Sequence, residues 1–472
     1  MRSLFIRIGI VLLAAIPLTV FPDSGHCAAV KKKEAVAVAD LWYAMEINSE
    51  QTKMTPEMKE ERLAKICDRE VLFLVSRNEL TSKAPDKGDV LAYVVKYEPD
   101  GFVVVSGEDR IKPVLVYNAA GAFSFEDPEQ NFMRHYLATA LVGRWDRLEQ
   151  RILMGEEPPV HEGWIHLRNR MKACPPLKHA TFGPQAQGRY TYVLWDTPLW
   201  HQWWPYNETA EAQNGGNNVP TGCTATAMAI KLRYHEWPPS GNGTYTYSDK
   251  EGSIQYSHFV DFGASTYNWS DMPFGNVTIS NQEVADLMYH CGVSVSMDYE
   301  LAGSGAWPTV SSMNIHFRYK GTGECVAYHV THARASIIGG LPVVMSSYPH
   351  TVVACGYRSS PSPNFYINAG YNGGSNGWYD LSGIPGGGTN PVQRSYPYSS
   401  PNNYMYVDKD SGSPEYGTLQ YPYNTLDPAN SAIPSGGELW IAGGTYSGSG
   451  NVPFKVNKAM TIKAYDGEVT IK

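Results

Sequence analysis

The first third of the chain alternates between helical and strand-like patterns of hydrophobic and polar residues. Charged and apolar residues are interleaved over 54–66, around a Thr-Pro pair that is typical of a helix start, so a helix is expected there. Residues 89–97 and 101–106 alternate as strands do, with a Glu-Pro-Asp-Gly turn where they meet. With a second helix over 131–153, these elements predict a compact α+β domain. The polar, Pro-containing residues 155–190 predict a linker after it.

Residues 190–408 have a different pattern, rich in Trp, Tyr, Gly and Asn, which favours strands joined by many turns. A helix is expected over 224–237, where a Pro-Pro pair stops it. Strands are expected at 341–346, 351–357 and 365–369. This second unit is therefore predicted to hold both a helix and a sheet.

The end of the chain has the pattern of a third, smaller unit. The polar residues 409–415 predict a hinge, and short strand signals follow, separated by Gly and Ser, at 438–442, 453–456 and 461–464. The tail also resembles the first turns of a right-handed β-helix at 417–424 and 443–446, although such a fold needs several stacked coils. A small all-β segment is therefore expected at 416–472, either as an add-on or as a partial β-helix.

The N-terminus has the pattern of a secretory signal peptide. Arg2 and Arg7 give it a positive start, residues 8–21 are uncharged and mainly apolar, and small residues follow at 27–29. Because the apolar run is short for a bilayer crossing, residues 1–29 are expected to be removed. The protein is then secreted, extracellular or periplasmic, with no membrane attachment after cleavage. An uncleaved anchor is the alternative.

Charge and cysteine content narrow the functional classes. Charged residues make up 18% of the chain and the net charge is -8, so the clustered Lys and Arg of nucleic-acid binding are not expected. The seven Cys do not form a disulfide framework, and their spacings are not those of zinc ligands. His329 and His332 would face opposite sides of a predicted strand. No metal and no cofactor are therefore expected.

The segment 220–229, Pro-Thr-Gly-Cys-Thr-Ala-Thr-Ala-Met-Ala, carries the strongest chemical signal. It places Cys223 at the start of the expected helix, directly after Gly222, which frees the backbone. Helix N-termini stabilise negative charge, so the pKa of the thiol is expected to fall and the nucleophilic thiolate to be favoured. The alternative is a small buried side chain that packs the helix start.

A thiolate nucleophile needs a base, and His350, at the mouth of the strand 351–357, is the candidate. Asn368 ends the neighbouring strand and would orient the imidazole, if a bend or bulge brings it level with His350. Gln202 precedes Cys223 and offers an amide that, with the backbone N–H of Cys223, would stabilise an oxyanion. A structural His and a surface Gln are the alternatives.

Taken in order, these residues resemble the streptopain family of bacterial cysteine peptidases. The resemblance rests on five stretches, at 200–207, 221–229, 235–238, 350–357 and 367–379. Together they are specific, whereas each alone is not. The resemblance covers about residues 36–408, because Gly-Phe-Val-Val-Val-Ser-Gly-Glu-Asp-Arg at 101–110 is similar to the propeptide of that family.

The resemblance implies a papain-like α+β fold for residues 181–408, with a helical part that presents the Cys and a sheet part that presents the His. It implies that residues 30–180 are an α+β propeptide with its linker, which inhibits the enzyme within the same chain. The implied catalytic residues are Cys223 as nucleophile, His350 as general base, Asn368 as its orienting partner and Gln202 in the oxyanion hole. Residues expected to contact substrate are Gly222, Tyr371 and Trp378.

Two positions depart from the pattern of the family. A Trp usually follows the Asn and another stands two residues later, whereas this chain has Ala369 and Tyr371. The first Trp normally shields the His–Asn hydrogen bond from water, so Ala369 is expected to leave that bond more exposed and weaker. Reduced activity or a changed pH optimum is then expected. The Gly-rich segment 385–390 is expected to be a loop near the site, either gating substrates or lying on the plain surface.

These features predict a secreted cysteine endopeptidase, made as a zymogen, that cuts proteins or peptides through an acyl-enzyme and activates itself by cutting its linker. One alternative is a catalytically weak binding protein on a peptidase scaffold. Another is an adhesin that acts through the C-terminal extension.

Overall fold

The computed structural model describes most of the chain after residue 28. The described residues are 29–47, 54–66, 68–76, 79–83, 85, 90–121, 123, 133, 136–137, 141–173, 191–194, 196–251, 253–321, 330–347, 350–358, 364–381, 394–396, 399–412 and 415–472. Most of the predicted signal peptide, the second half of the predicted linker (174–190) and the Gly-rich segment 385–390 lie outside them.

The N-terminal domain packs helices on both faces of a sheet. Its strands are β1 (Arg69–Ser76), β2 (Glu79–Thr81), β3 (Ala92–Tyr97), β4 (Phe102–Ser106) and β5 (Val114–Asn118), and its helices are α1 (Lys32–Ile47), α2 (Pro56–Ala64), α4 (Val142–Leu153) and α5 (Glu162–Ala173). α1 and α5 contribute to the apolar core on one face, and α4 contributes to the core on the other. Because both faces are covered, β4 and β5 are buried throughout. The expected α+β class is confirmed.

The middle of the chain forms a helical half around α7 (Cys223–His235). Every residue of α7 from Cys223 to Arg233 is buried, which agrees with its content of Ala and Thr. Around it lie α6 (Glu208–Gln213), α8 (Gln282–Ser294), α9 (Val310–His316) and a hairpin of β7 (Thr244–Glu251) and β8 (Ile254–Asp261). α7 coincides with the helix expected at 224–237.

The sheet half holds the three predicted strands as antiparallel neighbours. These are β10 (Val343–Ser347), β11 (His350–Arg358) and β12 (Asn364–Asn368). On the outer side of β10, β14 (Arg394–Tyr396) is paired with it, and on the outer side of β12, β13 (Gly377–Tyr379) is paired with it. The short strand β6 (Thr191–Val193) pairs with the end of β11. α7 packs directly against β10 and β11, which joins the two halves. The expectation that His332 lies on a strand is wrong, because it lies on the helix α10 (Val330–Ile338).

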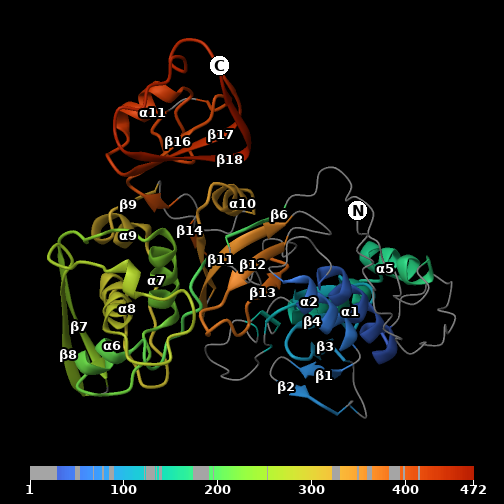
Figure 1. Cartoon of the computed structure of the whole chain (residues 1–472). Helices are drawn as coiled ribbons and strands as arrows, with labels where there is room; N and C mark the ends of the chain where they lie inside the picture. Colours follow the sequence, from blue (N-terminus) through green and yellow to red (C-terminus); the bar gives the residue numbers. More distant parts are fainter. Residues whose placement is uncertain are drawn as a thin grey trace, which may run out of the picture.

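One sheet runs through the sheet half and the N-terminal domain. Its order is β14-β10-β11-β12-β13-β5-β4-β3-β1-β2. The junction is an antiparallel pair in which Trp378 and Tyr379 of β13 lie opposite Tyr117 and Val116 of β5. Figure 1 shows the strands β11, β12 and β13 between the helical half and the N-terminal domain.

Polar contacts reinforce the junction between β13 and β5. Asp380 follows β13, and its Oδ2 lies 3.0 Å from Lys112 Nζ and 3.3 Å from Arg144 Nη2. Arg358 Nη1 of β11 lies 3.1 Å from Glu46 Oε2 of α1. The side chain of Asp380 is only 4% exposed, so this carboxylate and its two cations are largely shielded from water.

The C-terminal module is a parallel sheet of β16 (Tyr404–Val407), β17 (Gly437–Tyr446) and β18 (Met460–Ile471) with one helix, α11 (Leu426–Ala432). Met405, Leu439 and Ile462 stack in register across the three strands, as successive coils of a β-helix do. The expectation of an all-β tail is wrong because of α11, and residues 453–456 form no strand. β16 precedes the predicted hinge and β17 follows it, although the two pair in one sheet.

The C-terminal module packs against the sheet half. The hydroxyl of Tyr406 donates to the Gly339 carbonyl at 3.0 Å, just after α10. The Trp440 ring covers Gly340 so closely that a Cβ there would lie 2.5 Å from Cη2 of the indole. Lys320 Nζ, in the short strand β9 (Tyr319–Lys320) that pairs with β15 (Ser400–Pro401), donates to the carbonyls of Tyr404 and Gly417.

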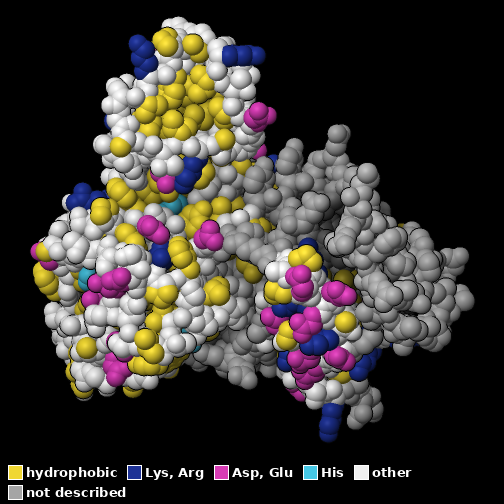
Figure 2. Space-filling view, viewed as in Figure 1, with side chains coloured by type: hydrophobic (Ala, Val, Ile, Leu, Met, Phe, Trp, Pro, Cys, Tyr) yellow, Lys and Arg dark blue, Asp and Glu magenta, His cyan; other side chains and the backbone are white. Residues whose placement is uncertain are grey.

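The surface composition differs between the units. Figure 2 shows acidic and basic side chains gathered over the N-terminal domain, and a broad hydrophobic area on the C-terminal module. Exposed apolar side chains of that module include Val452, Val456, Ile462 and Ile471. Among the described residues, none of the helices has the length and apolar character that a membrane crossing requires.

Candidate active site

Cys223, the predicted nucleophile, is the first residue of α7 and is 9% exposed. Burial raises the pKa of its thiol above the ordinary value, and hydrogen bonds from Thr351 and Thr224 lower it by less. The fall in pKa expected from the helix start is therefore not found in this structure, because desolvation of the thiolate outweighs the hydrogen bonds. In this state the thiol is favoured over the reactive thiolate.

The backbone at Gly222 sets the position of Cys223. Gly222 has φ 84° and ψ 144°, a conformation that only glycine adopts readily. A Cβ at this position would lie 2.7 Å from Met297 Sδ and 3.0 Å from the Ser304 carbonyl oxygen. Glycine is therefore required here both by the backbone angle and by the lack of space.

Three hydroxyl groups connect Cys223 with the strand that carries His350. Thr351 Oγ1 lies 3.1 Å from Thr224 Oγ1 and 2.9 Å from Ser346 Oγ. Thr224 follows Cys223 on α7, Thr351 follows His350 on β11, and Ser346 belongs to β10. This cluster therefore holds the helical half and the sheet half together directly beside the two predicted catalytic residues. The sequence analysis did not single out Thr351, although it directly follows His350.

His350, the predicted base, begins β11 and is 1% exposed. Its Nε2 lies 3.1 Å from the backbone carbonyl oxygen of Ala369. Because a carbonyl oxygen only accepts hydrogen bonds, Nε2 carries the proton in this contact, and Nδ1 is the basic nitrogen of the neutral ring. The atom that accepts the hydrogen bond from the His350 imidazole, and so orients the ring, is thus the main-chain oxygen of Ala369.

Asn368 lies beside this contact but its side chain points elsewhere. The predicted bulge exists, because the β11–β12 register shifts between Ala354 and Gly356, and Asn368 lies opposite Val353. The Asn368 amide donates to the Pro198 carbonyl at 2.8 Å, and its oxygen accepts from the Gly370 N–H at 3.2 Å. The hydrogen bond expected from Asn368 to His350 is therefore replaced by the one to the next residue's carbonyl.

The ring of Tyr371 stacks on the His350 imidazole, with centroids 5.3 Å apart and an angle of 26°. The His201 ring lies 5.4 Å from Tyr371. His350, Asn368 and Ala369 are each 1% exposed. The expectation that Ala369 opens this region to water is therefore wrong for this structure, because the side chains around it already exclude solvent.

Gln202, the predicted oxyanion donor, is 1% exposed. Its backbone carbonyl accepts a 2.9 Å hydrogen bond from the Thr221 N–H, which fixes it close to the start of α7. Among the described residues, neither heteroatom of its side-chain amide has a hydrogen-bond partner. A buried amide in this state is costly, and it has a free donor for a ligand that reaches it.

Of the residues expected to contact substrate, Gly222 and Tyr371 lie at the site and Trp378 does not. Trp378 is 4% exposed and packs in the core of the N-terminal domain, opposite Tyr117. The guanidinium of Arg358 lies between them, 4.4 Å from the Tyr117 ring and 4.7 Å from the Trp378 ring. Trp378 is therefore an interface residue between the domains.

No cluster of three or more potential metal ligands occurs among the described residues.

Two stretches of the chain match the models of known families. Residues 200–379, which contain Cys223, His350 and Gln202, match the model of the Peptidase C10 family. Residues 27–139, which form most of the N-terminal domain, match the model described as Spi protease inhibitor. Over residues 200–379 this chain is similar to the Peptidase C10 family. The resemblance to the streptopain family is thereby confirmed.

Individual relatives cover different parts of this chain. The thiol protease/hemagglutinin PrtT of Porphyromonas gingivalis is 27% identical over 328 residues, which are 65% of this chain and 35% of PrtT. Streptopain of Streptococcus pyogenes is 28% identical over 218 residues, 44% of this chain and 50% of streptopain. The chain thus spans half or less of the length of these relatives.

Among solved structures, a fragment of prointerpain A of Prevotella intermedia is similar, with 22% identity and a TM-score of 0.47, over 69% of this chain and 97% of that fragment.

Proposed function

We propose that this chain is the zymogen of a secreted cysteine endopeptidase of the Peptidase C10 family, and that residues 30–180 inhibit it within the same chain. The observation that carries the proposal is the meeting of two elements. α7 begins with Cys223, β11 begins with His350, and Thr224 and Thr351, the residues that follow them, are hydrogen-bonded at 3.1 Å. The match of residues 200–379 to the Peptidase C10 model and of residues 27–139 to the Spi protease inhibitor model support the same function.

The proposed reaction assigns a role to each group. Nδ1 of His350 takes the proton of the Cys223 thiol, and the thiolate attacks the carbonyl carbon of the scissile peptide bond. The resulting oxyanion accepts hydrogen bonds from the Gln202 amide and the Cys223 N–H. His350 then returns the proton to the leaving amine, and water hydrolyses the thioester. The Ala369 carbonyl holds the imidazole in the required tautomer, and it also stabilises the imidazolium.

Latency follows from the same geometry. In the precursor, burial keeps the pKa of the Cys223 thiol above its ordinary value, so little thiolate forms at neutral pH. β13 is paired with β5 of the N-terminal domain, and Asp380 is held by Lys112 and Arg144. Because residues 162–173 form α5 and Trp164 is buried in the core of the N-terminal domain, the activating cut is expected after α5 and not throughout the predicted linker 155–190. β5 then has to separate from β13 before the N-terminal domain can leave.

The test is to incubate the purified precursor under reducing conditions beside its Cys223→Ser variant, followed by mass spectrometry and a casein assay. Wild type should convert to a species that starts near residues 170–190 and degrades casein, whereas the variant stays full length. A third sample, Gln202→Ala, should mature and turn over more slowly, by about a hundredfold in kcat, as expected for loss of one oxyanion donor.

The proposal fails if wild type does not convert, if a product trimmed by another protease also leaves casein intact, and if Cys223 does not react with an alkylating probe. The adhesin alternative is then the one to pursue, by testing whether the full chain binds cells or matrix through its C-terminal module.

A further inference from the structure

Thr351 connects β11 with the sulfur of the predicted nucleophile. It makes hydrogen bonds to Cys223 through both its backbone and its side chain. Its Oγ1 also lies 3.1 Å from Thr224 Oγ1 and 2.9 Å from Ser346 Oγ. A hydroxyl group has one proton to donate, so the direction of each of these hydrogen bonds depends on the others.

The carbonyl of Ala306 fixes these directions. Thr224 Oγ1 lies 2.6 Å from its oxygen, which only accepts, so Thr224 gives its single proton there. Thr224 can then only accept from Thr351, and Thr351 in turn can only accept from Ser346. The proton of the Thr351 hydroxyl therefore points to Thr224. This arrangement suits a neutral thiol, because Cys223 can donate its own proton to Thr351 Oγ1.

Formation of the thiolate changes what the sulfur requires. A thiolate accepts hydrogen bonds and has no proton to donate. The Thr351 hydroxyl can turn from Thr224 to the sulfur, since the bonds from Ser346 to Thr351 and from Thr224 to Ala306 are kept. One bond between neutral groups is lost, and a bond to a charged acceptor, which is roughly twice as strong, replaces it.

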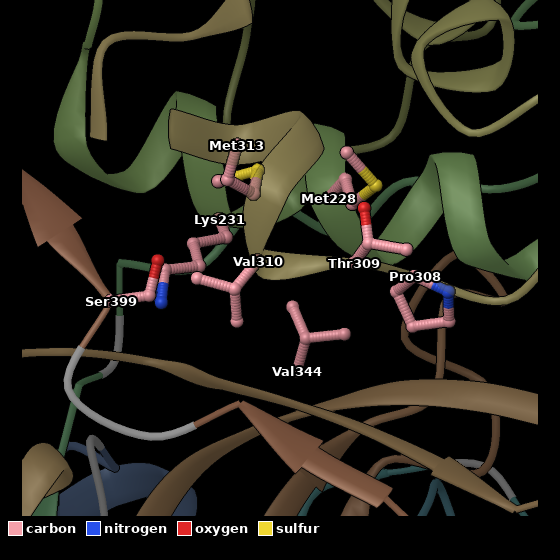
Figure 3. Close-up of a pocket in the computed structure, with 8 residues that line it drawn as sticks. All are labelled: Met228, Lys231, Pro308, Thr309, Val310, Met313, Val344 and Ser399. Atoms are coloured by element: carbon pink, nitrogen blue, oxygen red, sulfur yellow. The ribbon is translucent and has the colours of Figure 1, made fainter. Parts of the chain in front are cut away.

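The surroundings of this hydroxyl cluster strengthen a bond to a charged group. Its three hydroxyl-bearing residues are all buried. In the adjoining space between α7, α9 and β10, Figure 3 shows the apolar side chains of Met228, Val310 and Val344 around a small cavity. Hydrogen bonds to a charge are stronger in apolar surroundings, and a buried thiolate that lacks a donor is costly.

We propose that Thr351 is a positioning residue of the peptidase reaction, whose hydroxyl turns towards Cys223 and stabilises the attacking thiolate. The inference rests on the proposed function and adds a residue to the same site. Thr351 makes and breaks no covalent bond in it. The proton of the thiol goes to Nδ1 of His350, and the proton of Thr351 stays on its own oxygen.

Other titratable groups near Cys223 set the background for a measurement against pH. On the sheet half they are His350, which takes the proton, and the rings of Tyr371 and His201 that follow it. On the helical half, Lys231 lies about 12 Å further along α7, at 1.5 Å per residue. A substitution of Thr351 leaves all of these groups in the chain, so a shift of the pH profile reports the hydroxyl.

The experiment measures how fast iodoacetamide alkylates Cys223 in matured wild type, Thr351→Val and Thr351→Ser, from about pH 4 to about pH 9, by mass spectrometry. A trace of wild type converts any variant that does not mature alone. Thr351→Val keeps the backbone bond and loses the hydroxyl. The midpoint of its profile should rise by about one pH unit, with about tenfold slower alkylation below the midpoint and an unchanged rate well above it. Thr351→Ser should keep the wild-type midpoint.

Ser346→Ala is the matched control. It removes another hydrogen bond of the cluster, whereas the side-chain hydrogen bonds that act on the Cys223 thiol come from Thr351 and Thr224. Its midpoint should stay at the wild-type value. If Thr351→Val does not fold, Thr351→Ala removes the same hydroxyl with less bulk.

The inference is overturned if wild type cleaves peptides and the variant without the hydroxyl keeps the wild-type midpoint. It is also overturned if that variant is slower by the same factor at every pH, or if Ser346→Ala shifts the midpoint equally, because a merely structural role gives these results. A wild type that cleaves no peptide would instead contradict the proposed function.

Discussion

Gly222 couples the start of α7 to a loop far along the chain. Its positive φ turns the backbone so that Cys223 begins α7, and the space that a side chain would need is taken by Met297 and Ser304. The position of the predicted nucleophile therefore depends on contacts between segments 75 or more residues apart. A single added methyl group is enough to test this dependence.

Gly222→Ala is expected to lower the free energy of unfolding by about 2 kcal/mol, because it adds both backbone strain and a close contact. It should also displace Cys223 and slow maturation. Gly216→Ala is the control, since Gly216 has a similar φ of 82° with nothing within 4 Å of the added Cβ. Chemical denaturation of both variants measures the difference. Equal losses of stability would show that the contact with Met297 and Ser304 has no effect.

Ala369 lies in a closed part of the core, and this changes the expected effect of restoring the Trp of the family. With Ala369 1% exposed, Ala369→Trp should overpack the core and lower the free energy of unfolding by about 1–3 kcal/mol. Ala264→Trp, at an exposed loop position, should change it little. Thermal unfolding checks both. A stable Ala369→Trp enzyme with a higher turnover would restore the view that Ala369 weakens the site.

At the scale of elements, the edge-to-edge pairing of β5 with β13 is the main link between the N-terminal domain and the rest. It is short, and the buried carboxylate of Asp380 beside it balances two buried cations. Removing a buried carboxylate leaves such cations uncompensated, which costs several times more than breaking a pair on the surface.

Asp380→Asn should therefore loosen the N-terminal domain, lowering the free energy of unfolding of the precursor by about 3 kcal/mol and accelerating maturation. Glu70→Gln is the control, because its pair with Lys96 is exposed, at 53% and 38%. It should cost less than about 1 kcal/mol. Precursor half-life on gels and denaturation midpoints give the two readouts. An unchanged half-life for Asp380→Asn would remove this cluster from the latency mechanism.

The sequence predicted elements that are formed by residues close together in the chain more readily than features that depend on residues far apart. α7 and the three strands of the sheet half have local signals, a Pro-Pro stop and turn residues, and they were predicted. α8 also has a local signal, since Asn281 caps it by accepting from the Val284 N–H, but it was missed. The Ala369 carbonyl has no residue signature, because every residue carries a carbonyl. Trp378 was misplaced because its pairing with β5 joins residues more than 250 positions apart.

At the scale of the whole molecule, the C-terminal module is packed against the rest. Tyr406 bonds to Gly339, and Trp440 covers Gly340 after α10. α10 in turn contacts β11, the strand of His350. The module is therefore expected to unfold together with the sheet half.

Trp440→Ala should uncouple the two, because it removes the largest apolar contact at Gly340. We expect one calorimetric transition for wild type, and for the variant an additional transition at a lower temperature from the C-terminal module. Trp204→Ala, where the ring is 56% exposed, should keep a single transition. Two transitions in wild type would contradict the coupling.

The shared sheet has a consequence for the enzyme once its inhibitor has left. β13 then changes from an interior strand to an edge strand. The unpaired N–H and C=O groups of an edge strand can pair with another chain and so start aggregation. β13 spans only Gly377–Tyr379, so the border that maturation uncovers offers few such groups. Because so few groups become exposed, we expect the proposed release of residues 30–180 to leave an edge that is a weak template for aggregation.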